Sequence, residues 1–119
     1  MDGLNKIKET RIRKLLDELK QELLEKFSSR LINIIVYGSY AREEYSTDSD
    51  IDIFVLTSLS DKEIKSMEDV IVKISVELSL KYDILVSIHV KNISHFNNYF
   101  NTLPLYSNII REGIELYGK

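Results

Sequence analysis

Cysteine is missing from the 119-residue chain, which excludes a disulfide framework and a thiolate metal site. Apolar runs are short, and none approaches the ~18 residues that a membrane-spanning helix needs. The charged beginning MDGLNKIKETRIRK lacks the apolar segment of a secretion signal. With one proline, four glycines and no low-complexity tract, the sequence also shows no linker or repeat. We therefore expect one domain over residues 1–119, in the cytoplasm and without a membrane partner.

Positive charge is also in short supply. The 16 lysines and arginines are outnumbered by 19 aspartates and glutamates, which gives a net charge of −3 and a pI of about 5.4. Proteins that bind nucleic acid by releasing counterions present a basic surface. The charge balance therefore argues against direct binding of nucleic acid, and it suits a small substrate whose own charge is screened by a metal ion.

Hydrophobic periodicity predicts the order of helices and strands. An amphipathic helix is expected from about Leu4 to Phe27, and a capping box of Ser60 and Glu63 begins a second long helix that runs past Leu78. Apolar runs predict strands, and shorter periodic segments predict two short helices and an edge strand. The expected strands cover 31–38, 49–56, 82–90 and 114–117, and the short helices cover 94–100 and 104–111. The order predicts an α/β (α+β) domain with a small mixed sheet and helices packed mainly on one face.

The first candidate site is the turn in the stretch VYGSYARE. Gly38 directly follows a predicted buried strand, and a glycine there lets the backbone and a ligand approach closely. Amide groups at the start of the helical turn that follows can bind phosphate, and Ser39 adds a hydroxyl group. Strand–Gly–Ser–helix sequences occur in many folds, so a plain turn is the alternative interpretation.

The next strand carries acidic residues where apolar ones are expected. Because side chains alternate along a strand, Asp50, Asp52 and Phe54 share one face, while Ile51 and its alternating neighbours face the core. Two carboxylates ~7 Å apart on one strand can reach the same cation, and hard oxygen ligands suit Mg²⁺ or Mn²⁺. The alternative is a solvated edge strand protected against aggregation, although lysine is the more usual residue there and aspartate forms strands poorly.

The third predicted strand, YDILVSIHV, has one apolar face and one polar face. If it lies beside the second strand, Asp83 can join Asp50 and Asp52, and three carboxylates can hold two divalent ions. The alternative is that Asp83 is a turn residue between helix and strand. His89 shares the polar face, and we interpret it as a surface residue.

Gly38–Ser39, ten further residues and then Asp50–Ile51–Asp52 match a known signature. The pattern resembles the Gly-Ser…Asp-x-Asp motif of the DNA polymerase beta-like nucleotidyltransferases. The fuller run GSYAR…SDIDIFV resembles the minimal nucleotidyltransferases, which are small prokaryotic members of that superfamily. The resemblance covers most of the chain and implies the polymerase beta-like nucleotidyltransferase fold.

The resemblance also implies a role for each matched residue. The catalytic and metal-binding carboxylates would be Asp50, Asp52 and Asp83, holding Mg²⁺ as one or two ions, with Mn²⁺ as a substitute. The nucleotide-binding residues would be Gly38, Ser39, Arg42 and Ser49. The chain departs from the family at Glu43, where a glycine often follows the arginine, and this implies a changed loop surface.

The activity that the resemblance implies is transfer of a nucleoside monophosphate, usually AMP from ATP, with release of pyrophosphate. Minimal members often pair with a HEPN-domain ribonuclease toxin, act as its antitoxin and adenylylate one of its tyrosines. Two other functions remain open: an antitoxin that acts by binding alone, and a small-molecule nucleotidyltransferase whose acceptor pocket forms in a homodimer. The sequence leaves open ATP or another nucleoside triphosphate, and a monomer or a homo-oligomer.

Overall fold

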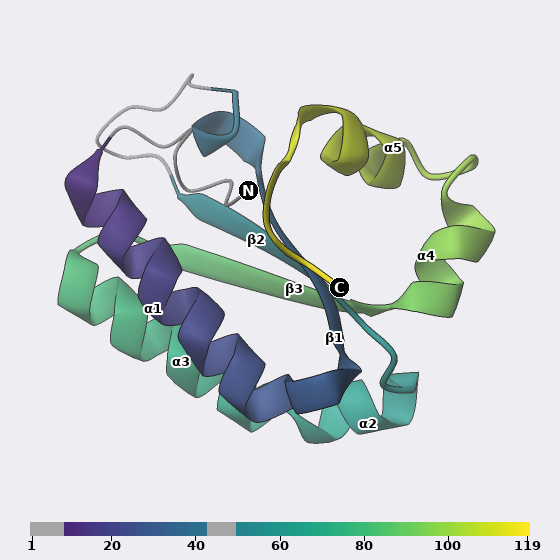
Figure 1. Ribbon diagram of the computed structural model, residues 1–119, viewed down its shortest axis with the longest axis horizontal. Helices are drawn as coiled ribbons and strands as arrows, with labels where there is room; N and C mark the ends of the chain where they lie inside the picture. The colour runs from purple at the N-terminus through teal and green to yellow at the C-terminus, as the bar shows by residue number, and fades with distance from the viewer. Residues whose placement is uncertain (1–8, 43–49) are drawn as a thin grey trace.

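The computed structural model describes residues 9–42 and 50–119, and these form a four-stranded sheet with the order β3-β2-β1-β4 (Figure 1). The strands are β1 (Leu31–Tyr37), β2 (Ile51–Thr57), β3 (Val86–Asn92) and β4 (Ile114–Gly118). β1 is antiparallel to both β2 and β4, whereas β3 is parallel to β2. The predicted mixed sheet in an α/β domain is therefore confirmed.

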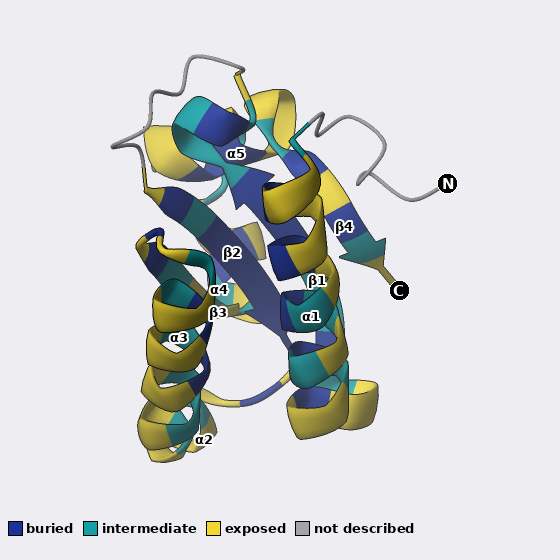
Figure 2. Ribbon diagram, turned by 90° about the vertical axis from the view of Figure 1, so that its left-hand side faces the viewer, coloured by how far each residue is buried: buried dark blue, intermediate teal, exposed yellow. Residues whose placement is uncertain are grey.

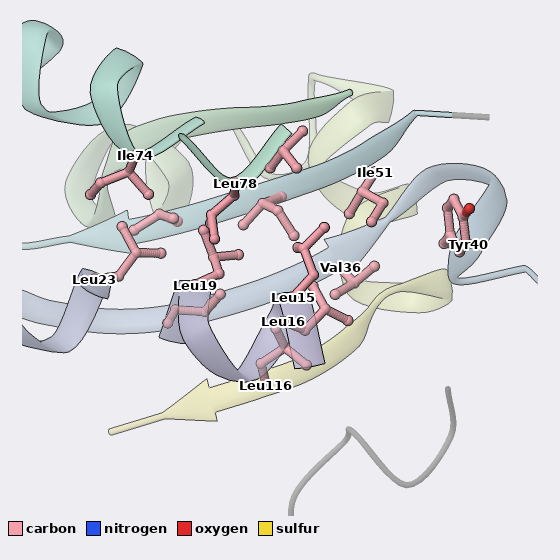
Figure 3. Packing of buried hydrophobic residues seen from close by; sticks show 14 of the residues in the cluster. Leu15, Leu16, Leu19, Leu23, Val36, Tyr40, Ile51, Ile74, Leu78 and Leu116 are labelled. Carbon is pink, nitrogen blue, oxygen red and sulfur yellow. The ribbon is translucent and has the colours of Figure 1, made fainter. Parts of the chain in front are cut away.

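The larger core lies between one face of the sheet and the helices α1 (Thr10–Phe27), α2 (Asp61–Ser66) and α3 (Glu68–Tyr82). The buried residues of α1 recur every three or four positions, which places one stripe of the helix against the strands. Figure 3 shows Leu15, Leu16, Leu19 and Leu23 of this stripe packed against the sheet. The predicted beginning of this helix at Leu4 lies outside the described residues.

The long helix predicted after Ser60 is divided in the structure. Its capping box is present, since the Glu63 N–H donates to Ser60 Oγ at 3.2 Å and the Ser60 N–H donates to Glu63 Oε1 at 3.0 Å. The prediction of one continuous helix is wrong, because α2 ends at Ser66 and α3 begins at Glu68. The apolar spacing continues through Met67, so periodicity alone gave no sign of the break.

Two shorter helices, α4 (Ile93–Tyr99) and α5 (Pro104–Glu112), lie on the other face of the sheet (Figure 1). They enclose a second cluster made of Ile35, Phe54, Leu56, Phe96, Tyr106 and Ile109. Phe54 of β2 is only 1% exposed there. The face of β2 that carries Asp52 is therefore polar at one end and covered by aromatic side chains at the other.

The third strand begins later than expected. α3 continues to Tyr82, Asp83 ends it in the left-handed conformation with a φ of 53°, and β3 begins at Val86. The last turn of α3 is attached to α1, because Lys81 Nζ and Tyr82 Oη donate to Glu18 Oε1 at 2.6 Å and 2.8 Å. In the described part of the chain, no helix combines the length and apolar character needed to cross a membrane.

Candidate functional site

The site is built around the three-residue 3₁₀ turn Gly38–Tyr40 that follows β1. Gly38 adopts a φ of +76°, a left-handed conformation that strongly favours glycine. Tyr40 is 2% exposed and lies at one end of the larger core, as Figure 3 shows. The turn is therefore fixed between a glycine that permits its backbone path and a tyrosine that is packed in the core.

The carboxylate of Asp52 lies directly against this turn. Tyr37, the residue before Gly38, pairs with Asp52 across β1 and β2. A Cβ atom added to Gly38 would lie only 2.5 Å from Asp52 Oδ2 and 3.5 Å from Asp52 Cγ. Such a contact is closer than real Cβ atoms make, so the absent side chain of Gly38 creates the space that the Asp52 carboxylate occupies.

Asp50 lies close enough to Asp52 for its charge to act on the Asp52 carboxyl group. Asp50 is exposed immediately before β2, and Asp52 is half-buried on the strand. The pKa of Asp52 is raised, first by burial; the nearby charges of His89 and Arg42 lower it, and the charge of Asp50 raises it. A negative charge on Asp52 is therefore only partly compensated by the protein's own cations.

The remaining predicted nucleotide-binding residues differ in what the structure shows. Ser39 is half-buried within the glycine turn. The exposed Arg42 follows this turn, and its Nη1 lies 3.5 Å from Glu112 Oε2 at the end of α5. Ser49 lies outside the described residues. The turn, Arg42 and Asp52 are thus brought together.

Asp83 has a different position from the other two carboxylates. It is exposed at the C-terminal end of α3, three residues before β3 begins, and is therefore not on the strand face next to Asp52. Among the described residues, no three His, Asp or Glu side chains are grouped so as to hold a metal ion. The assignment of Asp83 as a third metal ligand stays a prediction.

Two side chains of the site were not included in the predicted set. His89 follows Ser87 on the same face of β3, and Ser87 pairs with Asp52 in the parallel register. The ring of Tyr37 lies 6.3 Å from that of His89 and 6.2 Å from that of Phe54. Burial and the charge of Asp52 raise the pKa of Tyr37 to about 12, so this phenol is neutral at physiological pH. The alternation of apolar and polar residues along β3 was the sequence signal that could have placed His89 in the site.

The arrangement defines a class of site. One carboxylate on β2 and one immediately before it offer hard oxygen ligands for a divalent cation, and the neighbouring glycine turn lets a bulky anionic group approach the backbone. Together they suit a substrate that consists of phosphate groups and a divalent cation. The mixed sheet places both parts at one end of β1 and β2.

Comparison with known proteins identifies the family. The family model of the nucleotidyltransferase domain matches residues 16–116, a range that includes the glycine turn, Asp50 and Asp52. The chain therefore belongs to the nucleotidyltransferase domain family.

Relatives and solved structures agree with this family. The chain is 31% identical over 104 residues to "Putative protein adenylyltransferase MJ0604" of Methanocaldococcus jannaschii, which covers 87% of this chain and 96% of that protein. A chain in the crystal structure of a toxin-antitoxin with AMP-PNP has a TM-score of 0.54 at 20% identity, covering 87% of this chain and 73% of that one. A structure of a tri-AMPylated Shewanella oneidensis HEPN toxin in complex with MNT antitoxin has a TM-score of 0.50 at 18% identity, with coverages of 92% and 74%. These two likenesses show a common fold.

Proposed function

We propose that this nucleotidyltransferase transfers AMP from ATP to a hydroxyl group of a partner protein, a tyrosine of a HEPN-type toxin, and so acts as its antitoxin. The observation that carries the proposal is the Asp52 carboxylate seated 2.5 Å from the position of a Gly38 Cβ, at the turn suited to phosphate. The relative named a protein adenylyltransferase supports a protein acceptor. The toxin–antitoxin complexes of similar fold support the class of partner.

The residues of the site fit a divalent cation. Asp50 and Asp52 would hold Mg²⁺, or Mn²⁺ in its place, since both metals prefer carboxylate oxygens. When bound, the cation would neutralise negative charge on the triphosphate and on the departing pyrophosphate. Asp83 is retained in the proposal as the third carboxylate, although it ends α3 and lies outside β3.

The protein's other contributions are positional. The turn at Gly38 and Ser39 would hold the triphosphate close to the backbone, and Arg42 would add positive charge beside it. An acceptor oxygen would attack the α-phosphorus, forming a new O–P bond as the bond to the bridging oxygen of pyrophosphate breaks. The proton of the acceptor hydroxyl would be released to solvent. Correct alignment of these groups supplies much of the rate enhancement in reactions of this class.

A protein acceptor also fits the charge and accessibility of this chain. Asp50 is exposed at the edge of the site, where a docked partner could present a side chain. The net charge of −3 favours a basic partner, such as a ribonuclease whose surface binds RNA. Docking would then orient the acceptor hydroxyl, which must come within ~3–3.5 Å of the phosphorus atom.

Labelled nucleotides test the proposal directly. The chain is incubated with Mg²⁺ and a purified HEPN-type protein encoded beside it, using ATP labelled at either the α- or the γ-phosphate. We expect label from α-labelled ATP alone on the partner, since nucleotidyl transfer releases the γ-phosphate in pyrophosphate. Parallel reactions contain aminoglycosides or an RNA end as acceptors. Transfer to one of these with the partner unlabelled would contradict the proposal, and toxin inhibition without any label would indicate an antitoxin that acts by binding alone.

A further inference from the structure

The strand β3 lies at one edge of the described sheet, next to β2 alone. The Ile51 N–H donates to the carbonyl oxygen of Leu85 at 2.9 Å, which shows that the backbone groups of Leu85 point toward β2. Backbone groups alternate in direction along a strand, so those of Val86, Ile88 and Val90 point away from β2. These three residues therefore form the outer edge of β3.

α3 satisfies this outer edge at its beginning. The Val86 N–H donates to Ser79 Oγ at 3.0 Å, and the Ser75 hydroxyl donates to the Val86 carbonyl oxygen. From the described residues, no hydrogen bond reaches the outward backbone groups of Ile88 or Val90. The edge of β3 is thus covered by side-chain hydroxyls at one residue and is available for pairing at the next two outward positions.

An apolar groove of about 330 Å³ lies beside the available part of the edge. Its apolar lining comes from α2, α3 and β3, and Glu68, His89 and Lys91 supply its polar part. The apolar lining residues are Ile64, Ile71, Val72, Ile88 and Val90. Unpaired strand edges beside apolar surface are places where another chain can add a strand.

Exposed apolar side chains extend this surface along α3. Val72, Val76 and Leu80 are 59%, 49% and 80% exposed and recur every four residues. Figure 2 shows exposed residues along the outward side of α3, at the β3 end of the sheet. Ser75 and Ser79 mark the side of α3 that faces the edge of β3. Val72 lies three residues from Ser75 and Val76 lies three from Ser79, so both valines border that side.

We propose that β3 and the Val72–Val76 side of α3 form a two-fold symmetric interface between two copies of this chain. In this interface residues 88–90 of β3 pair with the same residues of the second copy in antiparallel orientation, since α3 already covers the outer side of Val86. Ile88 and Val90 of each copy exchange backbone hydrogen bonds with Val90 and Ile88 of the other, and the two His89 residues lie opposite each other at the axis. The two sheets join into one, and the α3 helices lie side by side.

A second copy of the chain can cover both parts of this surface, the available edge of β3 and the exposed valines of α3. The available strand edge needs another available edge, and the exposed valines beside it need an apolar surface at the same relative position. The chain itself carries both features in that arrangement. In the proposed register Lys91 lies opposite Ser87 of the second copy, so the lysines of the two copies do not face each other across the paired strands.

The absence of cysteine makes a crosslinking test specific. In antiparallel strands, opposed residues that do not exchange hydrogen bonds have Cα atoms about 4.5 Å apart, within the range that a disulfide can bridge. We expect His89→Cys to form a covalent dimer under mild oxidation. Glu115→Cys on β4, the other edge strand, is the matched control and is expected to remain uncrosslinked. Crosslinking of the Glu115→Cys variant alone would overturn the proposed interface.

Sedimentation of variants that retain the strand sequence provides the second test. We expect wild type to dimerise at about 100 µM. Val76→Asp should raise the dimer Kd at least ~100-fold, since both copies then carry a charge at the apolar contact. Ile110→Asp, at a residue of α5 that is 50% exposed, should leave the Kd within ~3-fold. A wild-type monomer at this concentration, or a dimer that Val76→Asp leaves intact, would overturn the proposal. Neither readout uses nucleotidyl transfer, so the outcome is independent of the proposed function.

Discussion

Replacing Gly38 with alanine changes the one residue on which the proposed site geometry depends most. The left-handed φ of +76° costs a non-glycine residue roughly 1–2 kcal/mol. The new Cβ would also lie 2.5 Å from Asp52 Oδ2, whereas ordinary contacts begin at 3.4 Å. The difference, 3.4 − 2.5 = 0.9 Å, is the displacement that the carboxylate or the turn must make.

We expect this displacement to reduce activity more than stability. A shift of about 1 Å in a catalytic group can reduce a reaction rate by ~10²-fold, whereas the backbone strain should lower the free energy of unfolding by only about 1–2 kcal/mol. Urea denaturation measures the stability of Gly38→Ala, calorimetry measures its affinity for Mg²⁺-ATP, and labelled ATP measures transfer to the partner. We expect a weakened affinity and a ~10²-fold loss of transfer from a protein that is still folded.

Two further variants separate the contact from the strain. Gly118→Ala is the matched control, because Gly118 ends β4 and its new Cβ would meet only the far end of the exposed Glu115 side chain. We expect this variant to retain wild-type binding and transfer. In an Asp52→Ala background, Gly38→Ala should cost less stability than in wild type, since only the φ strain remains. Wild-type transfer by Gly38→Ala would refute the placement of Asp52 against the turn.

Three other predictions concern the carboxylates of the proposed site and the aromatic cluster beside them. Asp52→Asn should abolish tight Mg²⁺-ATP binding and lower transfer by ~10³-fold or more. Asp83→Asn should weaken Mg²⁺-ATP binding less, because Asp83 precedes β3. If calorimetry finds equal losses of affinity for the two variants, Asp83 belongs to the metal site. In the absence of metal, Asp52→Asn should raise the melting temperature at pH 7 and leave it unchanged near pH 3. The reason is that the raised pKa favours protonated Asp52 in the folded state, so its stabilising contribution is present below the ordinary value of 3.8 and is lost as the pH rises through the raised pKa. A clear fall in the pH 7 melting temperature would mean that the charged carboxylate stabilises the fold. Phe54→Ala should lower the free energy of unfolding by about 3–5 kcal/mol, since Phe54 is 1% exposed and packs among Tyr37, Phe96 and Tyr106. If urea denaturation shows that the free energy of unfolding falls by less than about 1 kcal/mol, α4 and α5 do not cover this face.

Alternation and helical periodicity were sufficient to predict most of the fold. The pattern of β2 correctly placed Phe54 on one face and Ile51, Ile53 and Val55 on the other, because a strand with two covered faces still has a period of two. The capping box correctly identified Ser60 as the N-cap of α2, which begins at Asp61. These features depend on neighbouring residues in the chain and can be read from short windows.

Features that depend on distant contacts were harder to predict. The last turn of α3 contacts Glu18, which is 64 residues from Tyr82, and no short window of the sequence reports such a contact. His89 approaches Asp52 only because β3 pairs with β2 in one parallel register. The space between Gly38 and Asp52 likewise arises from pairing of β1 with β2, which no short window specifies.

The intact mass of a co-expressed HEPN-type partner is the most direct test of the central claim. We predict that the partner gains the mass of one or more AMP groups when produced with the wild-type chain. With Asp52→Asn the partner should keep its unmodified mass. Asp69→Asn, at an exposed aspartate in the first turn of α3, should modify the partner as wild type does. An unmodified partner with the wild-type chain, or equal modification with Asp52→Asn, would contradict the assignment of Asp52 to a protein adenylyltransferase site.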